Sequence, residues 1–266
     1  MQLLDPANWR LVRKFFLPDR PGRLVGLHTF QTGNGACLVD RWPDPRAVVA
    51  RSGGHCSLSG DPSALTPEDL AGHVSGMIDA PPEFVPLIEK AFPDVLVWER
   101  RILELPKAPA PAGNGSAVRR LGPGDVHRVW GLAPEIDWIH NPWGGPYGLA
   151  CSGYAWGGFD GDRLVSVAAS FFVGQRYEDV GVVTDAAFRG RGVNPACATK
   201  LCQDIRSRRR TPSWSTSPDN TASIRVAQKL GFEFVRPDRL YVVGQEIPEP
   251  ASVGESGESA SEGEKR

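Results

Sequence analysis

The stretch that decides the fold is YEDVGVVTDAAFRGRGVNPACATKLCQDIRSRRR, which occupies residues 177–210. The segment that ends at Thr184 is rich in β-branched and aromatic side chains, which favour a strand. A short turn follows, and we expect a helix from about Gly192 to Arg208. The chain therefore passes from a strand to a helix through a glycine-rich turn, without a hairpin.

The turn itself, RGRGVN, has the composition of an anion-binding site. Glycines at 190 and 192 allow backbone conformations closed to other residues and a close approach to a ligand. Unpaired amides at the start of the helix, together with the helix dipole, suit a pyrophosphate, and Arg189 and Arg191 add positive charge. The dinucleotide fingerprint G-x-G-x-x-G is excluded, because Pro195 stands where the third glycine belongs. A tight turn with exposed arginines is the alternative.

A second segment, PSWSTSPDNTASIRVAQKLGFEFV at residues 212–235, predicts a short strand and then a helix from Thr221 to Leu230. In this order the two segments resemble the GNAT superfamily of CoA-dependent N-acyltransferases. Arg189 to Asn194 matches the R/Q-x-x-G-x-G/A loop of that superfamily, with Asn194 in place of the final small residue. The resemblance covers about residues 116–243. The region before it resembles the N-terminal half of a bacterial GNAT subgroup with an extra domain.

The resemblance implies both a fold and a cofactor site. The fold is α/β (α+β), a GNAT-like mixed and largely antiparallel sheet flanked by helices, preceded by a smaller α+β domain. Acetyl-CoA would be the co-substrate, without a metal, and its pantetheine arm would enter where the strand ending at Thr184 parts from SWSTS at a bulge. A strand N–H group would polarise the thioester carbonyl. The expected cofactor-binding residues are Val182, Val183, Thr184, Arg189, Gly190, Arg191, Gly192, Val193, Asn194, Asn220 and Ser223.

The groups that move protons are less well defined by the sequence. Glu178 is the candidate general base, since it lies eleven residues before Arg189 (189 − 178), as in some relatives. A solvated acidic pair at the strand start is the alternative. Many relatives carry a tyrosine acid seven residues after the asparagine that opens the helix, but that position is Ala227 here. Tyr241 is the nearest later phenol and could equally be a core aromatic.

The acceptor pocket is expected in the tryptophan-rich segment between Trp130 and Trp156, because the resemblance places this segment over the acceptor side. Flat apolar walls with a few polar groups are typical of small-molecule sites. The alternative is a loop that only caps a core. The candidate acceptor residues are Trp138, His140, Trp143 and Tyr147.

Composition shifts divide the 266-residue chain into four parts. We expect an N-terminal α+β domain at 1–105, a Pro- and Ala-rich linker at 106–116, a GNAT-like domain at 117–243 and a disordered acidic tail at 244–266. In the first part, LVGLHTF and the runs after it are β-rich, and no repeat between the two halves is evident. His55 is predicted to have a structural role, because no asparagine or aspartate partner is visible beside it.

Charge and cysteine content exclude several classes of function. Residues 106–243 carry 17 Lys and Arg against 12 Asp and Glu, too mild an excess for a nucleic-acid-binding domain. The basic run RSRRR at 206–210 is expected to be a solvated helix end. No stretch approaches the ~20 apolar residues of a membrane span. The five cysteines form no CxxC, so we expect neither a metal site nor a disulfide framework. This cysteine pattern predicts a reduced, cytoplasmic location.

Together these observations predict an N-acetyltransferase that moves an acetyl group from acetyl-CoA to a primary amine of a small molecule. Direct attack is expected, since no cysteine stands beside a base. The expected partner is that amine, with no nucleic acid and no membrane, and a homodimer is compatible with the sequence. Because Ala227 replaces the usual acid, a silent acyl-CoA sensor or scaffold is the alternative, and a nucleic-acid-binding module is the second.

Overall fold

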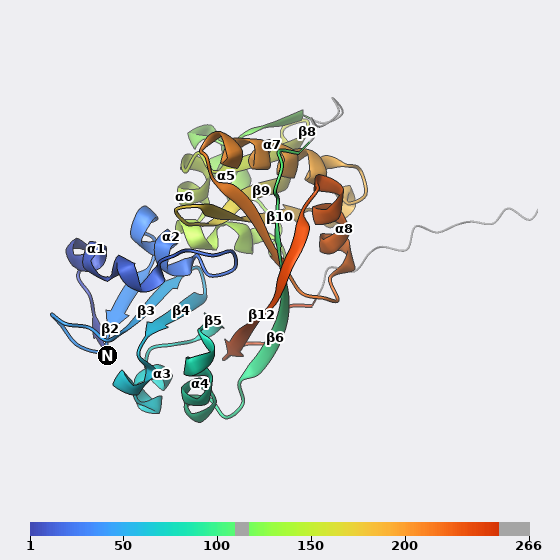
Figure 1. The fold of residues 1–266 in the computed structure, drawn as a ribbon. Coiled ribbons are helices and arrows are strands. Elements are labelled where there is room, and N and C mark those ends of the chain that lie inside the picture. Colours follow the sequence, from blue (N-terminus) through green and yellow to red (C-terminus); the bar gives the residue numbers. More distant parts are fainter. Residues whose placement is uncertain (110–116, 250–266) are drawn as a thin grey trace, which may run out of the picture.

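A twelve-stranded sheet forms the centre of the protein in a computed structural model that describes residues 1–109 and 117–249 (Figure 1). The strand order is β1-β2-β3-β4-β5-β12-β6-β11-β10-β9-β8-β7, and most neighbours are antiparallel. The expected mixed, largely antiparallel sheet is thus confirmed. The strands are β1 Gln2–Leu3, β2 Ala36–Val39, β3 Ala47–Ser52, β4 His55–Gly60, β5 Gly76–Asp79, β6 Leu96–Glu104, β7 Ala117–Arg120, β8 Ala155–Asp160, β9 Arg163–Val173, β10 Tyr177–Thr184, β11 Thr211–Thr216 and β12 Glu233–Val243.

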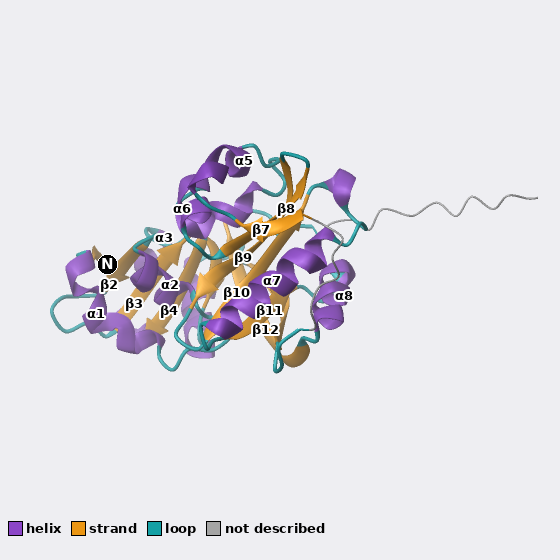
Figure 2. Ribbon diagram, turned by 90° about the horizontal axis from the view of Figure 1, so that it is seen from above, coloured by secondary structure: helices purple, strands orange, loops and turns teal. Residues whose placement is uncertain are grey.

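Helices cover both faces of the sheet (Figure 2). Helix α7 buries Cys197 and Leu201 against Val180 and Trp214, and α8 joins the same core. Helices α5 and α6 pack on the opposite face, against β8 and β9. No described helix is long and apolar enough to cross a membrane. The α-helices are α1 Trp9–Val12, α2 Val25–Thr32, α3 Pro67–Ala71, α4 Val85–Ala91, α5 Val126–Trp130, α6 Pro146–Cys151, α7 Val193–Ser207 and α8 Thr221–Leu230.

The two decisive segments fold as the sequence predicts, whereas LVGLHTF does not. Helix α7 and helix α8 match the expected helices within a residue or so at each end. The prediction of a β-rich run at LVGLHTF is wrong, because this segment forms most of α2, which ends at the left-handed Gly33. A short apolar run fits either a buried helix or a strand. In the structure Leu27 and His28 are fully buried, and the run forms a buried helix.

The chain repeats one topological unit, which the sequence did not reveal. A parallel strand pair joined through a helix, then another helix and a long strand, appears as β4-α3-β5-α4-β6 and again as β10-α7-β11-α8-β12. The two long strands pair with each other, so that β12 also contacts β5 and β6 also contacts β11 (Figure 1). The last strand of each half, β6 or β12, therefore pairs with a strand of the other half. Residues 1–105 and 117–243 thus share one sheet.

The two halves differ in the turn that follows the first strand of the parallel pair. Helix α3 starts at a capping box formed by Thr66 and Asp69, which satisfies its first amides. Helix α7 begins at Val193, after the N-cap residue Gly192, with no side-chain cap. Among the described residues, an open amide cradle with flanking glycines is thus a feature of the second half. Of the expected linker at 106–116 and the expected tail at 244–266, residues 110–116 and 250–266 lie outside the described residues.

Candidate active site

The parallel strands β10 and β11 part in the middle of the sheet. They pair at three positions, ending with Asp179 opposite Ser213, although β10 continues to Thr184. The pairing of β10 with β9 shifts register between Asp179 and Val180, a β-bulge in which Phe171 of β9 is the extra, unpaired residue. Beyond Asp179, the edge of β10 that faces β11 therefore has no strand partner. An extended ligand can pair with this edge as an added strand would.

The loop between β10 and α7 forms an open anion cradle. Gly190 and Gly192 both have φ of 76°, a left-handed conformation that favours glycine, and no atom lies within 4 Å of where their side chains would begin. Because no side chain caps α7, the amides of its first turn are free for a ligand. The Nδ2 of Asn194 donates to the Oγ1 of Thr184 at 3.1 Å and fixes the loop to the strand end.

Positive charge surrounds this cradle. Arg189 and Arg191 are exposed, and the Arg191 guanidinium lies over the Phe188 ring at 4.8 Å. Arg163, the first residue of β9, stacks on the same ring and pairs with Asp185. Arg163 is therefore already paired, whereas Arg189 and Arg191 have no ion pair among the described residues and can neutralise a phosphate without being buried.

The residues expected on the far side of the arm stand at the start of α8. The Oδ1 of Asn220 accepts the Ser223 amide at 3.0 Å, so Asn220 caps the helix and keeps its Nδ2 for a ligand. The Oγ of Ser223 accepts the indole N–H of Trp214. Ala227 is fully buried in the core of this unit, so a phenol has no room there. Tyr241 packs in the separate core of the N-terminal half.

Glu178 is buried and already paired. Its side chain has no exposed surface, and it accepts hydrogen bonds from Arg208 at 2.7 Å, Arg210 at 3.0 Å and Ser170. A general base must reach the proton that it takes, and these partners occupy both carboxylate oxygens of Glu178. The geometry favours a structural role. It also shows that two arginines of the basic run are half-buried internal partners, where the sequence predicted a solvated helix end.

Asp179 lies on the opposite face of β10 and has the properties of a proton acceptor. It is 7% exposed, accepts the hydroxyl of Ser213, and receives a long 3.4 Å hydrogen bond from the Gly22 amide. Burial raises the pKa of Asp179 to about 6, although the Ser213 hydrogen bond and Arg236 lower it. A carboxyl group with this pKa exchanges protons near neutral pH. It also sits at the point where the two strands part.

The four expected acceptor residues do not gather in one place. Trp138 is 41% exposed and packs edge-on against Phe171 at 5.4 Å, on the same face of the sheet as Asp179. His140 is half-buried, its Nδ1 has no partner among the described residues, and burial lowers its pKa. Trp143 is a core residue whose indole donates to the Ser170 carbonyl. Tyr147 is 71% exposed.

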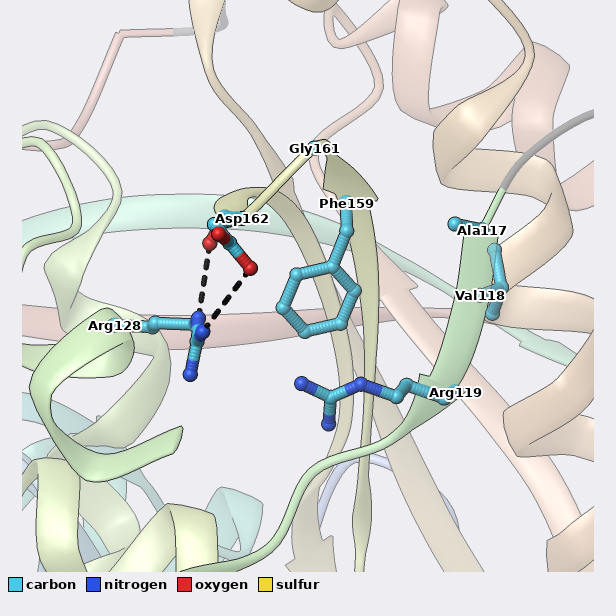
Figure 3. Close-up of a pocket in the computed structure, with 7 residues that line it drawn as sticks. All are labelled: Ala117, Val118, Arg119, Arg128, Phe159, Gly161 and Asp162. Atoms are coloured by element: carbon cyan, nitrogen blue, oxygen red, sulfur yellow. Dashed lines mark hydrogen bonds and ion pairs between the residues drawn. The ribbon is translucent and has the colours of Figure 1, made fainter. Parts of the chain in front are cut away.

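A shallow cavity of about 240 Å³ lies elsewhere, at the outer edge of the sheet (Figure 3). Arg128 pairs with Asp162 on one side of it, and Arg119 lies over the Phe159 ring on the other. Strands β8 and β9 separate this edge from the point where β10 and β11 part. The cavity therefore lies away from the point where β10 and β11 part. The described residues contain no group of three or more His, Cys, Asp or Glu side chains placed to hold a metal.

A parted parallel strand pair beside an uncapped, glycine-rich helix start defines an acyl-CoA-dependent N-acyltransferase. The comparisons with known proteins agree: a family profile described as GNAT acetyltransferase matches residues 152–241. An uncharacterised N-acetyltransferase from the mutA 5' region of Streptomyces virginiae is 39% identical over 209 residues, which are 77% of this chain and 88% of that protein. The chain belongs to the GNAT acetyltransferase family.

Solved structures show the same fold. A GCN5-related N-acetyltransferase-like protein from Streptococcus suis has a TM-score of 0.67 at 18% identity, with 89% of this chain and 98% of that chain covered. A tandem GNAT protein from the clavulanic acid biosynthesis pathway has a TM-score of 0.54 at 11% identity, covering 89% and 93%. The second likeness agrees with the repeated topology, since it extends over both halves of the chain.

Sequence reasoning did not single out two polar residues that lie on one face of the sheet beside the point where β10 and β11 part. Asp179 was passed over in favour of its neighbour, although strand alternation already placed the two carboxylates on opposite faces. Arg100 belongs to β6, which the sequence assigns to the N-terminal half, and the structure places it beside β11. No sequence pattern signals that exchange of strands.

Proposed function

We propose that this protein transfers the acetyl group of acetyl-CoA to the primary amine of a small molecule by direct attack. The observation that carries the proposal is the open edge of β10, which leads from the strand-parting point at Asp179 to the amide cradle at Gly192. An extended arm and a diphosphate have complementary partners along that one line.

The chain's own residues hold the cofactor in this proposal. Amides at the start of α7 bind the pyrophosphate, and Arg189 and Arg191 neutralise it. Backbone groups between Val182 and Thr184 pair with the pantetheine arm, and the free Nδ2 of Asn220 donates to the arm from the other side. A β10 amide beyond the bulge donates to the thioester carbonyl, where negative charge develops during attack.

Asp179 takes the proton from the amine in this proposal. It lies where the two strands part, and its pKa of about 6 leaves it ionised at neutral pH. Glu178 instead holds Arg208 and Arg210 and thereby ties the end of α7 to the sheet. The leaving thiolate is protonated from solvent, since Ala227 replaces the phenol of many relatives and is packed in the core.

Thiol release from acetyl-CoA across a panel of amines tests the activity, and calorimetry with CoA tests the site. We expect CoA to bind and at least one amine to release thiol above the hydrolysis background. CoA binding without turnover on any amine would instead support the sensor, an alternative that the buried Ala227 keeps open. A flat calorimetric trace at millimolar CoA would remove both.

A further inference from the structure

Arg100 on β6 has an unusual environment for an arginine. It is half-buried on the same face of the sheet as Asp179, and among the described residues no carboxylate lies within 4 Å of it. Its Nε donates to the Ser215 hydroxyl at 3.1 Å and its Nη2 to the Ser215 carbonyl at 2.8 Å, while the Trp98 ring stacks on the guanidinium at 4.0 Å.

These contacts use two of the five N–H donors of Arg100, which leaves three, on Nη1 and Nη2. Partners on the chain orient the guanidinium but do not neutralise it. Burial therefore lowers the pKa of Arg100 to about 10, against the attraction of more distant carboxylates. The Nη1 and Nη2 edge is the fork that binds a carboxylate in a bidentate manner.

The face of the sheet that carries Arg100 also carries polar groups that can bind an amine. Asp179 accepts the Ser213 hydroxyl and Arg100 donates to the Ser215 hydroxyl, and these two serines lie two residues apart on the same face of β11. Phe172 lies opposite Asp179 in the sheet, and the His55 ring packs on Phe172 at 5.1 Å. Four strands, β4, β6, β9 and β10, thus contribute to one face beside the strand-parting point.

His55 has a fixed tautomer that leaves one nitrogen available. Its Nδ1 lies 3.1 Å from the Gly53 carbonyl, to which it must donate, so Nε2 carries the lone pair. Nε2 makes no hydrogen bond to any part of the chain that the structure describes. Burial lowers the pKa of His55 to about 4, and the ring is therefore neutral at pH 7. A neutral imidazole nitrogen accepts a hydrogen bond from an amine without competing for its proton.

We propose that the acceptor is an amino acid, with its carboxylate on Arg100 and its amino group between Asp179 and the Nε2 of His55. This inference rests on the proposed acetyl transfer and names its substrate class. A single guanidinium fork matches a monoanionic carboxylate better than a phosphate, which carries nearly two charges. Because Arg100 and His55 come from the N-terminal half, the proposed acceptor site is incomplete without that half.

The test uses wild-type protein and matched acceptor pairs, each an amino acid and its methyl ester, together with one phosphorylated amine, phosphoethanolamine. We expect thiol release from acetyl-CoA with at least one amino acid, and a kcat/KM about ten- to a hundredfold lower for its ester, the range of one lost charge-assisted contact. Equal rates for acid and ester, turnover of esters or phosphoethanolamine alone, or no turnover of any amino acid would each overturn the proposal.

Arg100→Gln is the matching protein change, and Arg101→Gln is its control, because Arg101 is the next residue on β6 and stacks on Phe234 instead. We expect Arg100→Gln to raise KM for the amino acid and leave KM for the ester unchanged, with Arg100→Lys intermediate and Arg101→Gln like wild type. A KM effect of equal size on acid and ester would contradict the assignment. Calorimetry with CoA separates the two proposals, since its failure removes the acetyl transfer itself.

Discussion

Replacing Glu178 by glutamine separates a structural carboxylate from a general base. The change keeps the size of the side chain and removes its charge, so that Arg208 and Arg210 lose the partner that they share. If Glu178 is structural, the damage appears in the stability of the protein. If it is the base, the damage appears in the rate.

The expected loss of stability follows from burial. Removing one partner of a buried ion pair costs about 3–5 kcal/mol. The side chains of Arg208 and Arg210 are 22% and 20% exposed, and Arg208 also keeps Asp204 at 2.6 Å. The lower end of the range therefore applies, about 3 kcal/mol, which lowers the melting temperature of a protein of this size by about 6–12 °C.

Thermal unfolding followed by circular dichroism, with thiol release at 25 °C on the folded protein, measures both effects. We expect Glu178→Gln to melt early and to keep most of its kcat. Asp179→Asn is the matched comparison, since it changes the next residue in the same way. It should lower kcat by about 10²–10⁴-fold, the usual contribution of a general base.

The stability of Asp179→Asn has a defined sign. The folded-state pKa of Asp179 is raised, so ionisation destabilises the fold above about pH 6, and this part of the stability is lost as pH rises from about 4 to 6. At pH 7.5 the asparagine variant should therefore melt no earlier than wild type. A Glu178→Gln protein with an unchanged melting temperature and a hundredfold lower kcat would refute the reasoning.

Three further predictions test the rest of the site. The kcat/KM of wild type should rise with pH around an apparent pKa of about 6, because Asp179 must be ionised among Ser213, the Gly22 amide, Arg236, Asp238 and Arg100; a flat pH profile would contradict this. Ser213→Ala removes a hydrogen bond that lowers that pKa and should shift the rise to higher pH, whereas a shift to lower pH would be wrong in sign. Gly192→Glu should abolish CoA binding in calorimetry, since it strains a left-handed position and places a carboxylate in the cradle, and undiminished affinity would show that the loop is not the site.

The candidate site was predictable where it depends on local sequence. The strand that ends at Thr184, the glycines of the loop and the helix after it lie close together in the chain, and their conformations follow from residue type. The start of α8 at Asn220 is equally local, because an asparagine at that position caps the helix with its own side chain. Both elements appear in the structure where the sequence placed them.

The roles of the two adjacent carboxylates could not be obtained in this way. Strand alternation separates Glu178 from Asp179, but it does not say which face carries arginines. Arg208 reaches Glu178 from the end of α7, and the Gly22 amide reaches Asp179 from the opposite end of the chain. Those contacts decide which carboxylate is neutralised and which is only desolvated.

By itself, the sequence determined the class of the protein and the position of the glycine-rich loop proposed to bind the cofactor, because a strand, a glycine turn and a helix start are fixed by short-range backbone preferences. Only the tertiary structure decided which residues form the proposed acceptor side. The exchange of β6 and β12 between the halves brings Arg100 next to Ser215, 115 residues away. Hydrogen bonds between such distant strands depend on the packing of the whole sheet, and no local pattern encodes them.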